Sequence, residues 1–414
     1  MADARQYPKI EPWQFDLKSP RQPSLDADRQ FDTRALHSGF HPIEDTTNFR
    51  TFVPPIVQSA TFPYESFDNR PTYVYSRNRN PTTNVLEDRL AALEGGEACV
   101  TSSSGSQMLF NLLLTMLHPG DSIVTSLHIF GEGYKQASTI LPERLGVSCN
   151  FVANPADPEE WDRAIDSTTR LVWVETPSNP SLFVTDIAAV AAVAHSHGVP
   201  LLVDNTTATA ALQKPIDLGA DMVLLSITKF LSGNASVLGG ALIGPRALIE
   251  DVRMNTIEFV GAVLAPFESW LTLQYLDSLS MRMERHSSNA VRVAEFLSGH
   301  PKVVRVNYPG LASHPRHELA KRQMKGCSGL LSFVVPDGMD GAARVMNNLK
   351  LITRAVTFGT SRTICMHPRT ITHQHMAPEE RLAAGIDDGM IRLSVGLEGI
   401  DDLITDLDQA LSHL

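Results

Sequence analysis

The segment Met222-Val-Leu-Leu-Ser226-Ile-Thr-Lys229 decides which fold we expect for this chain. It is an apolar run that ends in two hydroxyl side chains and a lysine. Two similar runs precede it, because residues 171–174 lead to Glu175 and residues 200–203 lead to Asp204. Apolar runs of this length, separated by helical stretches, are typical of buried parallel strands in an α/β sheet.

The polar residues that follow these runs indicate a shared site. Ligands of parallel sheets bind beyond the carboxyl ends of the strands, so Glu175, Asp204 and Lys229 are expected close together. A lysine amine can form a Schiff base, an aspartate can keep a pyridine nitrogen protonated, and hydroxyls can bind phosphate. Asp204 followed by Ser226 and Thr228 before Lys229 therefore predicts a pyridoxal 5'-phosphate site.

Each of these residues also has a simpler explanation when it is taken alone. A lysine after a strand is usually exposed, and an aspartate there often caps the next helix. The segment 103–107, Ser-Ser-Gly-Ser-Gln, opens a helix that either binds phosphate or is merely capped. Arg392 lies in a strand-like run, where it either pairs with a substrate carboxylate or points outward. The combination with Lys229 favours the functional interpretation.

Length and pattern predict three parts in the 414-residue chain. They are an extended, proline-bearing N-terminal arm (1–66), a large domain (67–258) and a C-terminal domain (259–414). Periodicity predicts helices at 85–93, 186–197, 268–297 and 401–411, with the first capped by 82–84, and strands at 330–335 and 390–395.

Composition excludes several classes of function. A formal net charge of −11 argues against a nucleic-acid partner. No apolar run approaches the ~18 residues of a membrane span, and the first 34 residues show no secretory signal. Widely spaced cysteines predict a reduced, cytoplasmic protein. The histidines at 367, 373 and 375 stand in a proline-bearing loop without a ligand pattern, so we expect no metal.

Longer motifs then make the chain recognisable. From about Thr33 to the C-terminus it resembles the cystathionine γ-synthase family of fold-type I pyridoxal-phosphate enzymes, the Cys/Met-metabolism group. The resemblance implies an α/β fold of the aspartate aminotransferase type, with a mostly parallel seven-stranded sheet and a smaller C-terminal α/β domain. It rests on Tyr75-Ser-Arg77-x-x-Asn80-Pro81-Thr82, Ser104-Gly105, Glu175-Thr-Pro-Ser-Asn179-Pro180, Asp204-Asn205-Thr206, Ser226-x-Thr228-Lys229, Tyr308-Pro-Gly-Leu-x-Ser-His-Pro315, Met366-His-Pro-x-x-x-Thr-His373 and Arg392-Leu-Ser-Val-Gly-Leu-Glu398.

The resemblance implies a role for most of these residues. Lys229 would carry the cofactor, Asp204 would pair with its ring nitrogen, and Asn179 would contact the cofactor or the substrate. The phosphate would be held by Ser104, Gly105, Ser106, Ser226 and Thr228. Tyr75 and Arg77 would reach the phosphate of a neighbouring protomer, which implies a dimer at least and a homotetramer as a dimer of dimers. Substrate binding would fall to Glu132, Asn179, Thr357, Arg362 and Arg392.

One departure from the family pattern concerns the leaving group. Where the family usually stacks a tyrosine over the cofactor ring, this chain has Phe130, which keeps the aromatic face and loses the hydroxyl. Some homoserine-ester sulfhydrylases share this change. Tyr134 lies four residues later and would be a substitute proton donor if the segment is helical. We therefore assign catalysis to Lys229, Phe130 and Tyr134.

A second departure concerns the distal end of the substrate. Glu132 would favour a cationic group such as guanidinium, which suggests canavanine, a substrate of one γ-lyase activity in this family. The alternative is an ion pair between Glu132 and Arg362. Arg362 itself disfavours cystathionine and suits a succinyl group.

We therefore predict a pyridoxal-phosphate enzyme that acts at Cγ of a homoserine-derived amino acid. The first expectation is a γ-lyase of the canavanine or methionine type. The runner-up is an O-acetyl- or O-succinylhomoserine sulfhydrylase or a cystathionine γ-synthase. A catalytically idle binding protein is a third class, which the intact Asp204, Lys229 and Arg392 argue against.

Overall fold

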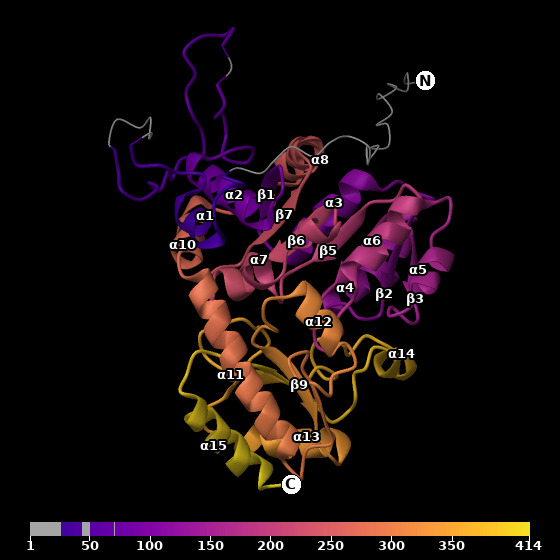
Figure 1. Ribbon diagram of the computed structural model, residues 1–414. Helices are drawn as coiled ribbons and strands as arrows, with labels where there is room; N and C mark the ends of the chain where they lie inside the picture. Colours follow the sequence, from indigo (N-terminus) through magenta and orange to yellow (C-terminus); the bar gives the residue numbers. More distant parts are fainter. Residues whose placement is uncertain (1–25, 44–49, 70) are drawn as a thin grey trace.

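The computed structural model describes residues 26–43, 50–69 and 71–414, which form two α/β lobes joined by a long helix (Figure 1). The large lobe holds a seven-stranded sheet, and the C-terminal lobe holds a five-stranded sheet. The expected α/β fold with two sheets is confirmed. The boundaries predicted at residues 66 and 258 stay a prediction.

The large sheet has the strand order β1-β7-β6-β5-β4-β2-β3. Strands β2 to β6 run parallel, and β7 is antiparallel to both of its neighbours, β1 and β6. This is the mostly parallel sheet expected from the sequence. Its strands are β1 (Ala98–Ser102), β2 (Ser122–Ser126), β3 (Ser148–Val152), β4 (Thr169–Glu175), β5 (Leu201–Asp204), β6 (Met222–Ser226) and β7 (Gly240–Gly244).

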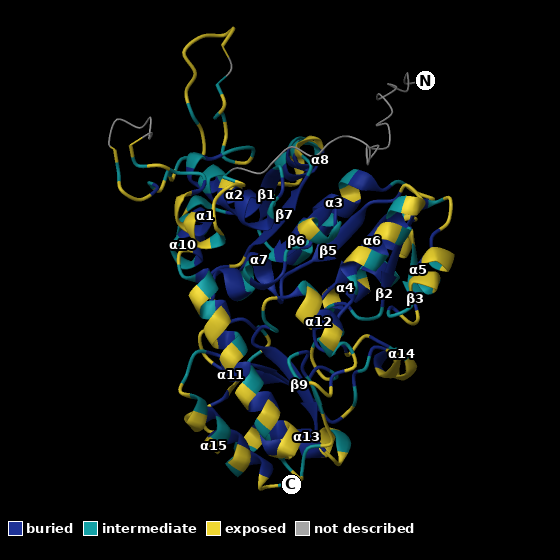
Figure 2. Ribbon diagram, in the orientation of Figure 1, coloured by how far each residue is buried: buried dark blue, intermediate teal, exposed yellow. Residues whose placement is uncertain are grey.

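Helices cover both faces of this sheet, so its central strands are buried on both sides (Figures 1 and 2). Val172, Val203 and Val223 are fully buried, which explains why these strands read as continuous apolar runs. The covering segments are α2 (Pro81–Glu94), α3 (Gly105–Met116), α4 (Gly131–Lys135), η1 (Gln136–Leu145), α5 (Pro158–Ala164), α6 (Ile187–Ser196), α7 (Thr209–Leu212), η2 (Ile216–Leu218), η3 (Ile227–Leu231), α8 (Arg246–Asp251), η4 (Val252–Ile257) and α9 (Glu258–Val260).

The N-terminal region differs from the extended arm that we predicted. Its first 25 residues and residues 44–49 lie outside the described part of the chain, but α1 (Phe31–His37) is helical. The next helix, α2, begins four residues before the predicted start of the helix at 85–93. Asn80 caps it by accepting a hydrogen bond from the Thr82 N–H at 3.0 Å, with Pro81 in the first turn.

The single helix predicted at 268–297 is two helices, α10 (Pro266–Leu276) and α11 (Leu279–Gly299). The chain turns at Asp277, whose carboxylate binds Arg89 of α2 at 3.2 Å. Arg282 satisfies a freed carbonyl at the break by donating to the Tyr275 oxygen at 2.9 Å. One of these two partners, Arg89, is far along the chain, and periodicity does not reveal it.

The C-terminal lobe packs one face of its sheet against α11, α13 and α15, with a separate apolar core. The strand order is β10-β11-β12-β9-β8, antiparallel except for β10 with β11. Its elements are β8 (Arg305–Asn307), α12 (His317–Gln323), β9 (Leu330–Val334), α13 (Gly338–Asn348), β10 (Thr353–Arg354), β11 (Ile364–Met366), α14 (Pro378–Ala383), β12 (Met390–Ser394) and α15 (Ile400–Leu411).

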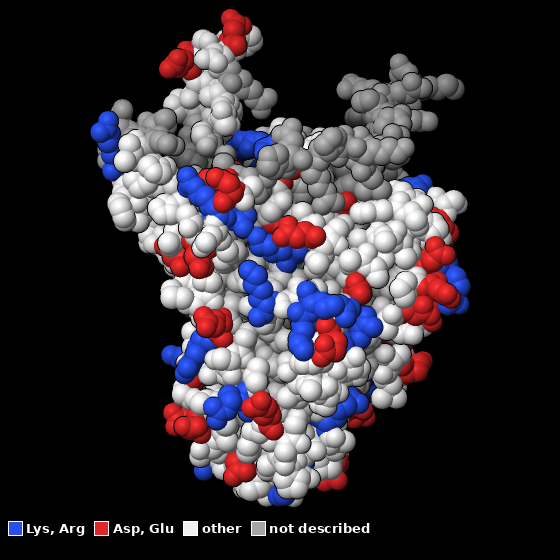
Figure 3. Space-filling view, viewed as in Figure 1, with Lys and Arg blue, Asp and Glu red and all other residues white. Residues whose placement is uncertain are grey.

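Two surface properties bear on partners. Among the described residues, no helix has the length and apolarity that crossing a bilayer requires. Basic and acidic side chains are interspersed over the face seen in Figure 3, without a continuous basic stripe on that face. That face therefore lacks the clustered positive charge that is typical of nucleic-acid-binding surfaces.

Candidate active site

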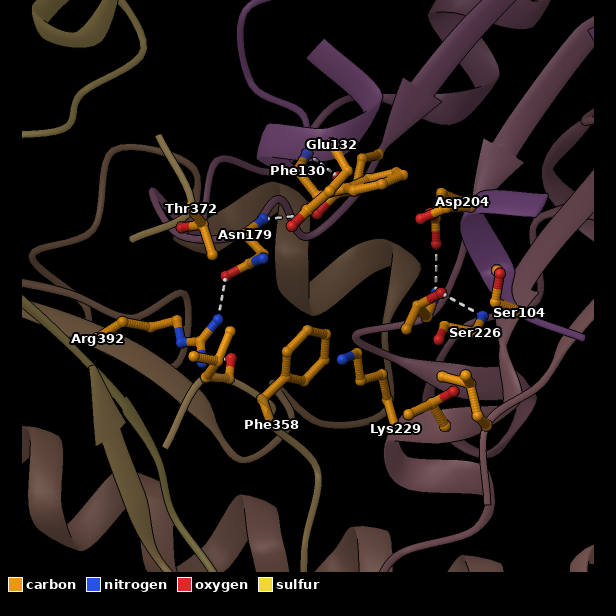
Figure 4. A pocket seen from close by; sticks show the side chains of 17 residues that line it. Ser104, Phe130, Glu132, Asn179, Asp204, Ser226, Lys229, Phe358, Thr372 and Arg392 are labelled. Atoms are coloured by element: carbon orange, nitrogen blue, oxygen red, sulfur yellow. Dashed lines mark hydrogen bonds between the residues drawn. The ribbon is translucent and has the colours of Figure 1, made fainter. Parts of the chain in front are cut away.

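A cavity opens where the carboxyl ends of the large sheet face the C-terminal lobe (Figure 4). It combines residues from strand ends, helix starts and loops of both lobes. The residues that line it are Ser104, Gly105, Ser106, Phe130, Glu132, Glu175, Asn179, Asp204, Thr206, Ser226, Thr228, Lys229, Leu238, Val356, Phe358, Thr372 and Arg392. Most of the predicted site residues therefore lie together.

Strand register explains why the polar residues at the ends of the apolar runs meet. Glu175 of β4 pairs with Asp204 of β5, and Asp204 pairs in turn with Leu224 of β6. Lys229 follows β6 in the π-helical segment η3, where its backbone leaves helical geometry at φ −92° and ψ −129°. This local break brings the lysine to the same edge of the sheet.

Lys229 is half-buried, and its amine has few polar neighbours. Its Nζ donates to the Thr357 hydroxyl at 3.1 Å and lies 5.0 Å from the centre of the Phe358 ring. Burial and the positive charge of Arg392 lower the pKa of Lys229 to about 8, against opposing effects of Glu132 and Asp204. A lysine with a pKa near neutrality is partly deprotonated and can act as a nucleophile or base.

Asp204 faces the cavity, and few protein groups offset the burial of its negative charge. It accepts a hydrogen bond from the Thr206 N–H at 2.9 Å, and Thr206 in turn accepts from the Ser226 N–H at 2.8 Å. Burial raises the pKa of Asp204, while the hydrogen bonds with Thr206 and the charge of Lys229 lower it. A buried carboxylate of this kind is stabilised by a cation placed against it.

The start of helix α3 and the loop around Lys229 form a cradle of small and hydroxylated residues. Ser104 caps α3 by accepting a hydrogen bond from the Gln107 N–H at 3.1 Å. A Cβ atom on Gly105 would lie 3.0 Å from the Ser226 Cβ, so a side chain there would crowd the cradle. Thr228 is fixed by the Gly239 N–H, which donates to its hydroxyl at 3.0 Å. The free N–H groups of a helix start suit an anion.

Phe130 and Asn179 belong to two loops that Glu175 holds together. The Phe130 N–H donates to one Glu175 oxygen at 2.6 Å, and the Asn179 N–H donates to the other at 2.7 Å. The Phe130 ring meets Trp173 edge to face, with 6.0 Å between ring centres. Burial and the charge of Asp204 raise the pKa of Glu175 well above its usual range.

Arg392 is a buried guanidinium without a carboxylate partner among the described residues. Its Nη1 donates to the Asn179 side-chain oxygen at 3.1 Å, and its Nη2 donates to the backbone oxygens of Val356 and Thr357 at 2.9 and 2.6 Å. Burial lowers its pKa to about 10. An unpaired buried guanidinium at a cavity suits an anionic group such as an α-carboxylate.

Glu132 and Arg362, which we considered as an ion pair, are not joined. Glu132 lines the cavity, and no ion pair connects its carboxylate to a residue in the described ranges. Arg362 is exposed and is absent from the cavity lining, so the alternative of an ion pair with Glu132 is wrong for this structure. The assignment of Arg362 to substrate binding has no support from its position.

Tyr134 also lies elsewhere than predicted. The segment is helical, as that expectation required, but the Tyr134 hydroxyl donates to a Glu380 oxygen of α14 at 2.7 Å. Its ring packs near Phe151, and the residue does not line the cavity. The predicted role as a substitute proton donor is therefore corrected, because a neighbouring lobe holds the hydroxyl away from the site.

Tyr75 and Arg77 are brought together, but outside the cavity of their own chain. The Arg77 guanidinium lies 5.1 Å from the centre of the Tyr75 ring, and both residues are exposed. Arg77 lies beside the end of α9, where a Cβ atom on Gly261 would be 3.8 Å from its Cδ. Their placement leaves the role across a protomer boundary as a prediction.

The histidines considered for metal binding have other partners. His367 bonds the Asp388 oxygen at 2.8 Å and the Thr370 hydroxyl at 3.0 Å, and His373 bonds the Thr372 hydroxyl at 2.8 Å. Across the described residues, no three histidine, cysteine, aspartate or glutamate side chains form a group suited to a metal ion.

The sequence predictions omitted some residues that line the cavity. Glu175 was expected near the site but received no role, although its position in the Glu-Thr-Pro-Ser-Asn motif was a usable signal. Thr372 lies inside the motif that ends at His373, which was also quoted without a role. Phe358 and Val356 precede a glycine in an unremarkable loop, and no local pattern indicates them.

Comparison with known proteins gives consistent relatives. A family model described as Cys/Met metabolism PLP-dependent enzyme matches residues 32–412. The L-methionine gamma-lyase of Treponema denticola is 39% identical over 395 residues, covering 93% of this chain and 97% of that protein. The O-succinylhomoserine sulfhydrylase of Mycobacterium tuberculosis is 41% identical over 344 residues, covering 82% and 84%.

Solved structures agree with the sequence relatives. The cystathionine gamma synthase of Xanthomonas oryzae, solved with aminoacrylate and cysteine, superimposes with a TM-score of 0.88 at 37% identity, covering 93% of this chain and 98% of that one. The cystathionine gamma-lyase of Lactobacillus plantarum, solved with L-serine, gives a TM-score of 0.88 at 34% identity, covering 93% and 99%. Elimination and replacement enzymes are thus equally similar in fold.

Proposed function

Because this chain belongs to the Cys/Met metabolism PLP-dependent enzyme family, we propose that it is a γ-lyase for a homoserine-derived amino acid with a cationic distal group. L-Canavanine is the first candidate. The chain is a pyridoxal-phosphate enzyme, and its relatives perform γ-elimination or γ-replacement. The proposal concerns which of these reactions it performs and on which substrate.

The donor set of the cavity fits pyridoxal phosphate. Asp204 is a buried carboxylate that needs a cation, as a protonated ring nitrogen would be. The N–H groups at the start of α3 and the hydroxyls of Ser226 and Thr228 offer a place for the phosphate. Lys229 offers the amine. When bound, the cofactor supplies an electron-accepting ring that stabilises the charge left by proton removal at Cα.

The residues of the chain divide the remaining work among them. Arg392 would bind the substrate α-carboxylate, with Asn179 fixing the guanidinium on one side. Lys229, once its amine is free, would remove the Cα proton and move a proton at Cβ, since its pKa of about 8 suits both directions of transfer. Phe130 covers one side of the cavity without offering a proton to the leaving group.

Glu132 is the observation that carries the choice of substrate. It lies in the cavity without an ion-pair partner among the described side chains, and its charge acts on both Lys229 and Arg392. A guanidinium group could meet this carboxylate with two parallel hydrogen bonds. The leaving group of canavanine also needs less protonation than a thiolate, which accords with a phenylalanine at position 130.

A second candidate is an O-acylhomoserine sulfhydrylase. The similarity to sulfhydrylases from Mycobacterium tuberculosis and Corynebacterium glutamicum supports it. Phe130 supports it as well, because an acyloxy group leaves readily without a proton donor. Arg362 does not, since it is exposed and does not line the cavity.

The test is turnover of L-canavanine against O-acetyl- and O-succinylhomoserine, with and without sulfide, reading homoserine, 2-oxobutyrate and homocysteine. We expect canavanine to be consumed without sulfide, and Glu132→Gln to lower kcat/KM for canavanine by about tenfold or more while sparing the esters. Glu143→Gln, a change at an exposed glutamate of η1, is the control. Sulfide-dependent homocysteine from an ester, with canavanine untouched, would establish the second candidate instead.

We further propose a homotetramer in the cytoplasm. The exposed aromatic side chains of two N-terminal residues, Phe52 at 89% and Phe67 at 95% exposure, support burial against another copy. Exposed Tyr75 and Arg77 support a contribution to a neighbouring cofactor site. All four cysteines are free, which accords with a reducing compartment. Light scattering of the purified protein tests the assembly.

A further inference from the structure

We propose that Glu175 is a positioning residue that holds the loop bearing Phe130 and the loop bearing Asn179 at a fixed separation across the cavity. A single carboxylate would then set both the aromatic cover of the cofactor and the clamp for the substrate carboxylate. The inference depends on the pyridoxal-phosphate chemistry of the family and not on the choice of substrate.

The hydrogen bonds of Glu175 define this role. Its two oxygens each accept one backbone N–H, from Phe130 at 2.6 Å and from Asn179 at 2.7 Å. These two hydrogen bonds lower the pKa of Glu175, against the larger effects of burial and the charge of Asp204, and they leave neither oxygen without a donor. With 5% exposure, the side chain is shielded from water that might replace either bond.

Each loop reaches a different part of the cavity. Phe130 ends the first loop as the N-cap of α4, and Glu132 lies in the first turn of that helix, so holding this loop also places the carboxylate proposed to bind the distal group of the substrate. Asn179 accepts from Arg392 at 3.1 Å, so the second loop fixes the guanidinium. Figure 4 shows Phe130, Glu132 and Asn179 grouped on the side of the cavity opposite Lys229.

Comparison with Asp204 separates the two neighbouring carboxylates by function. Glu175 and Asp204 pair in register on adjacent strands, and both are buried. Asp204 accepts one backbone N–H, from Thr206, and keeps an oxygen for the cofactor. Glu175 has both oxygens engaged by loops. Asp204 therefore faces the ligand, and Glu175 shapes the walls around it.

The test uses the holoenzyme with three variants. Glu175→Gln keeps the size of the side chain but places its amide NH2, which is itself a donor, against one of the two backbone N–H donors. Glu175→Asp keeps the carboxyl group but is one methylene too short to hold both loops. Asp406→Asn is the matched control, because buried Asp406 accepts the N–H groups of Lys350, Leu351 and Ile352 in the C-terminal lobe.

The readouts are the visible circular dichroism of the bound cofactor, which needs no substrate, and kcat and KM for an amino acid that the enzyme turns over. We expect both Glu175 variants to weaken the dichroic band and to lower kcat/KM by about ten- to a hundredfold, through a higher KM and a lower kcat. The control should lower the melting temperature and leave band and kinetics per folded enzyme unchanged.

Two outcomes would overturn the proposal. One is a Glu175→Gln enzyme whose band and kinetics match the wild type, or whose loss only follows the folded fraction as in the control. The other is a Glu175→Asp enzyme with the wild-type band and kinetics, which would mean that a carboxyl group suffices without the reach to both loops. If Glu175→Gln fails to fold, Glu175→Asp decides. An absent visible band in the wild type would instead contradict the cofactor assignment.

Discussion

The side of the cavity that carries Asp204, Ser226 and Lys229 is made of strand ends, and we call it the cofactor wall. The opposite side carries Glu132, Asn179 and Arg392, and we call it the substrate wall. The cofactor wall comes from neighbouring strands of one sheet, whose register fixes its polar residues. The substrate wall combines the start of helix α4 and a loop of the large lobe with strand β12 of the C-terminal lobe.

The positions of some functional residues therefore depend on local sequence, and the positions of others depend on distant parts of the chain. A residue at the end of a parallel strand is positioned by backbone hydrogen bonds that its own sequence pattern predicts. A residue such as Glu132 is positioned by the segments that pack against the start of α4. There Gly131 lies so close to the Thr372 carbonyl that a Cβ atom would be 1.8 Å from its oxygen.

The largest effect on kcat/KM is expected at Arg392, in the substrate wall. Arg392→Lys keeps the positive charge but cannot present a planar fork to a carboxylate while bonding Asn179 and two backbone oxygens. We expect kcat/KM to fall about a hundredfold, mainly through KM, in steady-state kinetics.

The same substitution at exposed Arg362 is the control, and we expect less than about a twofold change there. Equal sensitivity of the two positions would break the assignment of the substrate wall. A sensitive Arg362 with a tolerant Arg392 would restore the original expectation that Arg362 binds substrate.

A smaller effect is expected behind the cofactor wall, at Glu94. This glutamate is buried, and Asn205, next to Asp204, donates to it at 3.3 Å. Burial raises the pKa of Glu94 to about 8. Between the ordinary pKa of a glutamate and this value, the folded state holds the proton more tightly than the unfolded state, so stability falls as pH rises.

Glu94→Gln should remove this slope, which amounts to up to about 1.4 kcal/mol per pH unit for one proton. The melting temperature of the variant relative to wild type should therefore rise from pH 5 to pH 8, with kcat/KM nearly unchanged. Glu284→Gln, at an exposed glutamate of α11, should show no such trend. A large loss of activity in Glu94→Gln would mean that this residue belongs to the site itself.

The sequence predicted the cofactor wall better than the substrate wall for physical reasons. Glu175, Asp204 and Lys229 each follow an apolar run, and sheet register brings them together as expected. Tyr134 was wrongly placed because its hydroxyl is held by a contact between lobes, and Arg362 is exposed outside the cavity. Glu380 of α14 holds the Tyr134 hydroxyl, and nothing in the segment around Tyr134 indicates that partner.

Helix boundaries illustrate the same distinction. The alanine-rich helix predicted at 186–197 is found as α6 (Ile187–Ser196), because Asp186 caps it by accepting the Ala189 N–H at 3.1 Å. The long helix predicted at 268–297 is broken, because Arg89 and Arg282 bind the turn between α10 and α11. Local capping signals are visible in the sequence, whereas a partner as distant as Arg89 is not.

The central claim is that Lys229 carries the cofactor, and borohydride reduction of the holoenzyme followed by peptide mass spectrometry tests it most directly. Reduction fixes a Schiff base as a stable adduct on the lysine that formed it. The account predicts a pyridoxyl mass increase on the peptide that contains Lys229, absent in Lys229→Ala, with Lys214→Ala as an unaffected control. An adduct on another lysine, or none in an enzyme that turns over its substrate, would contradict it.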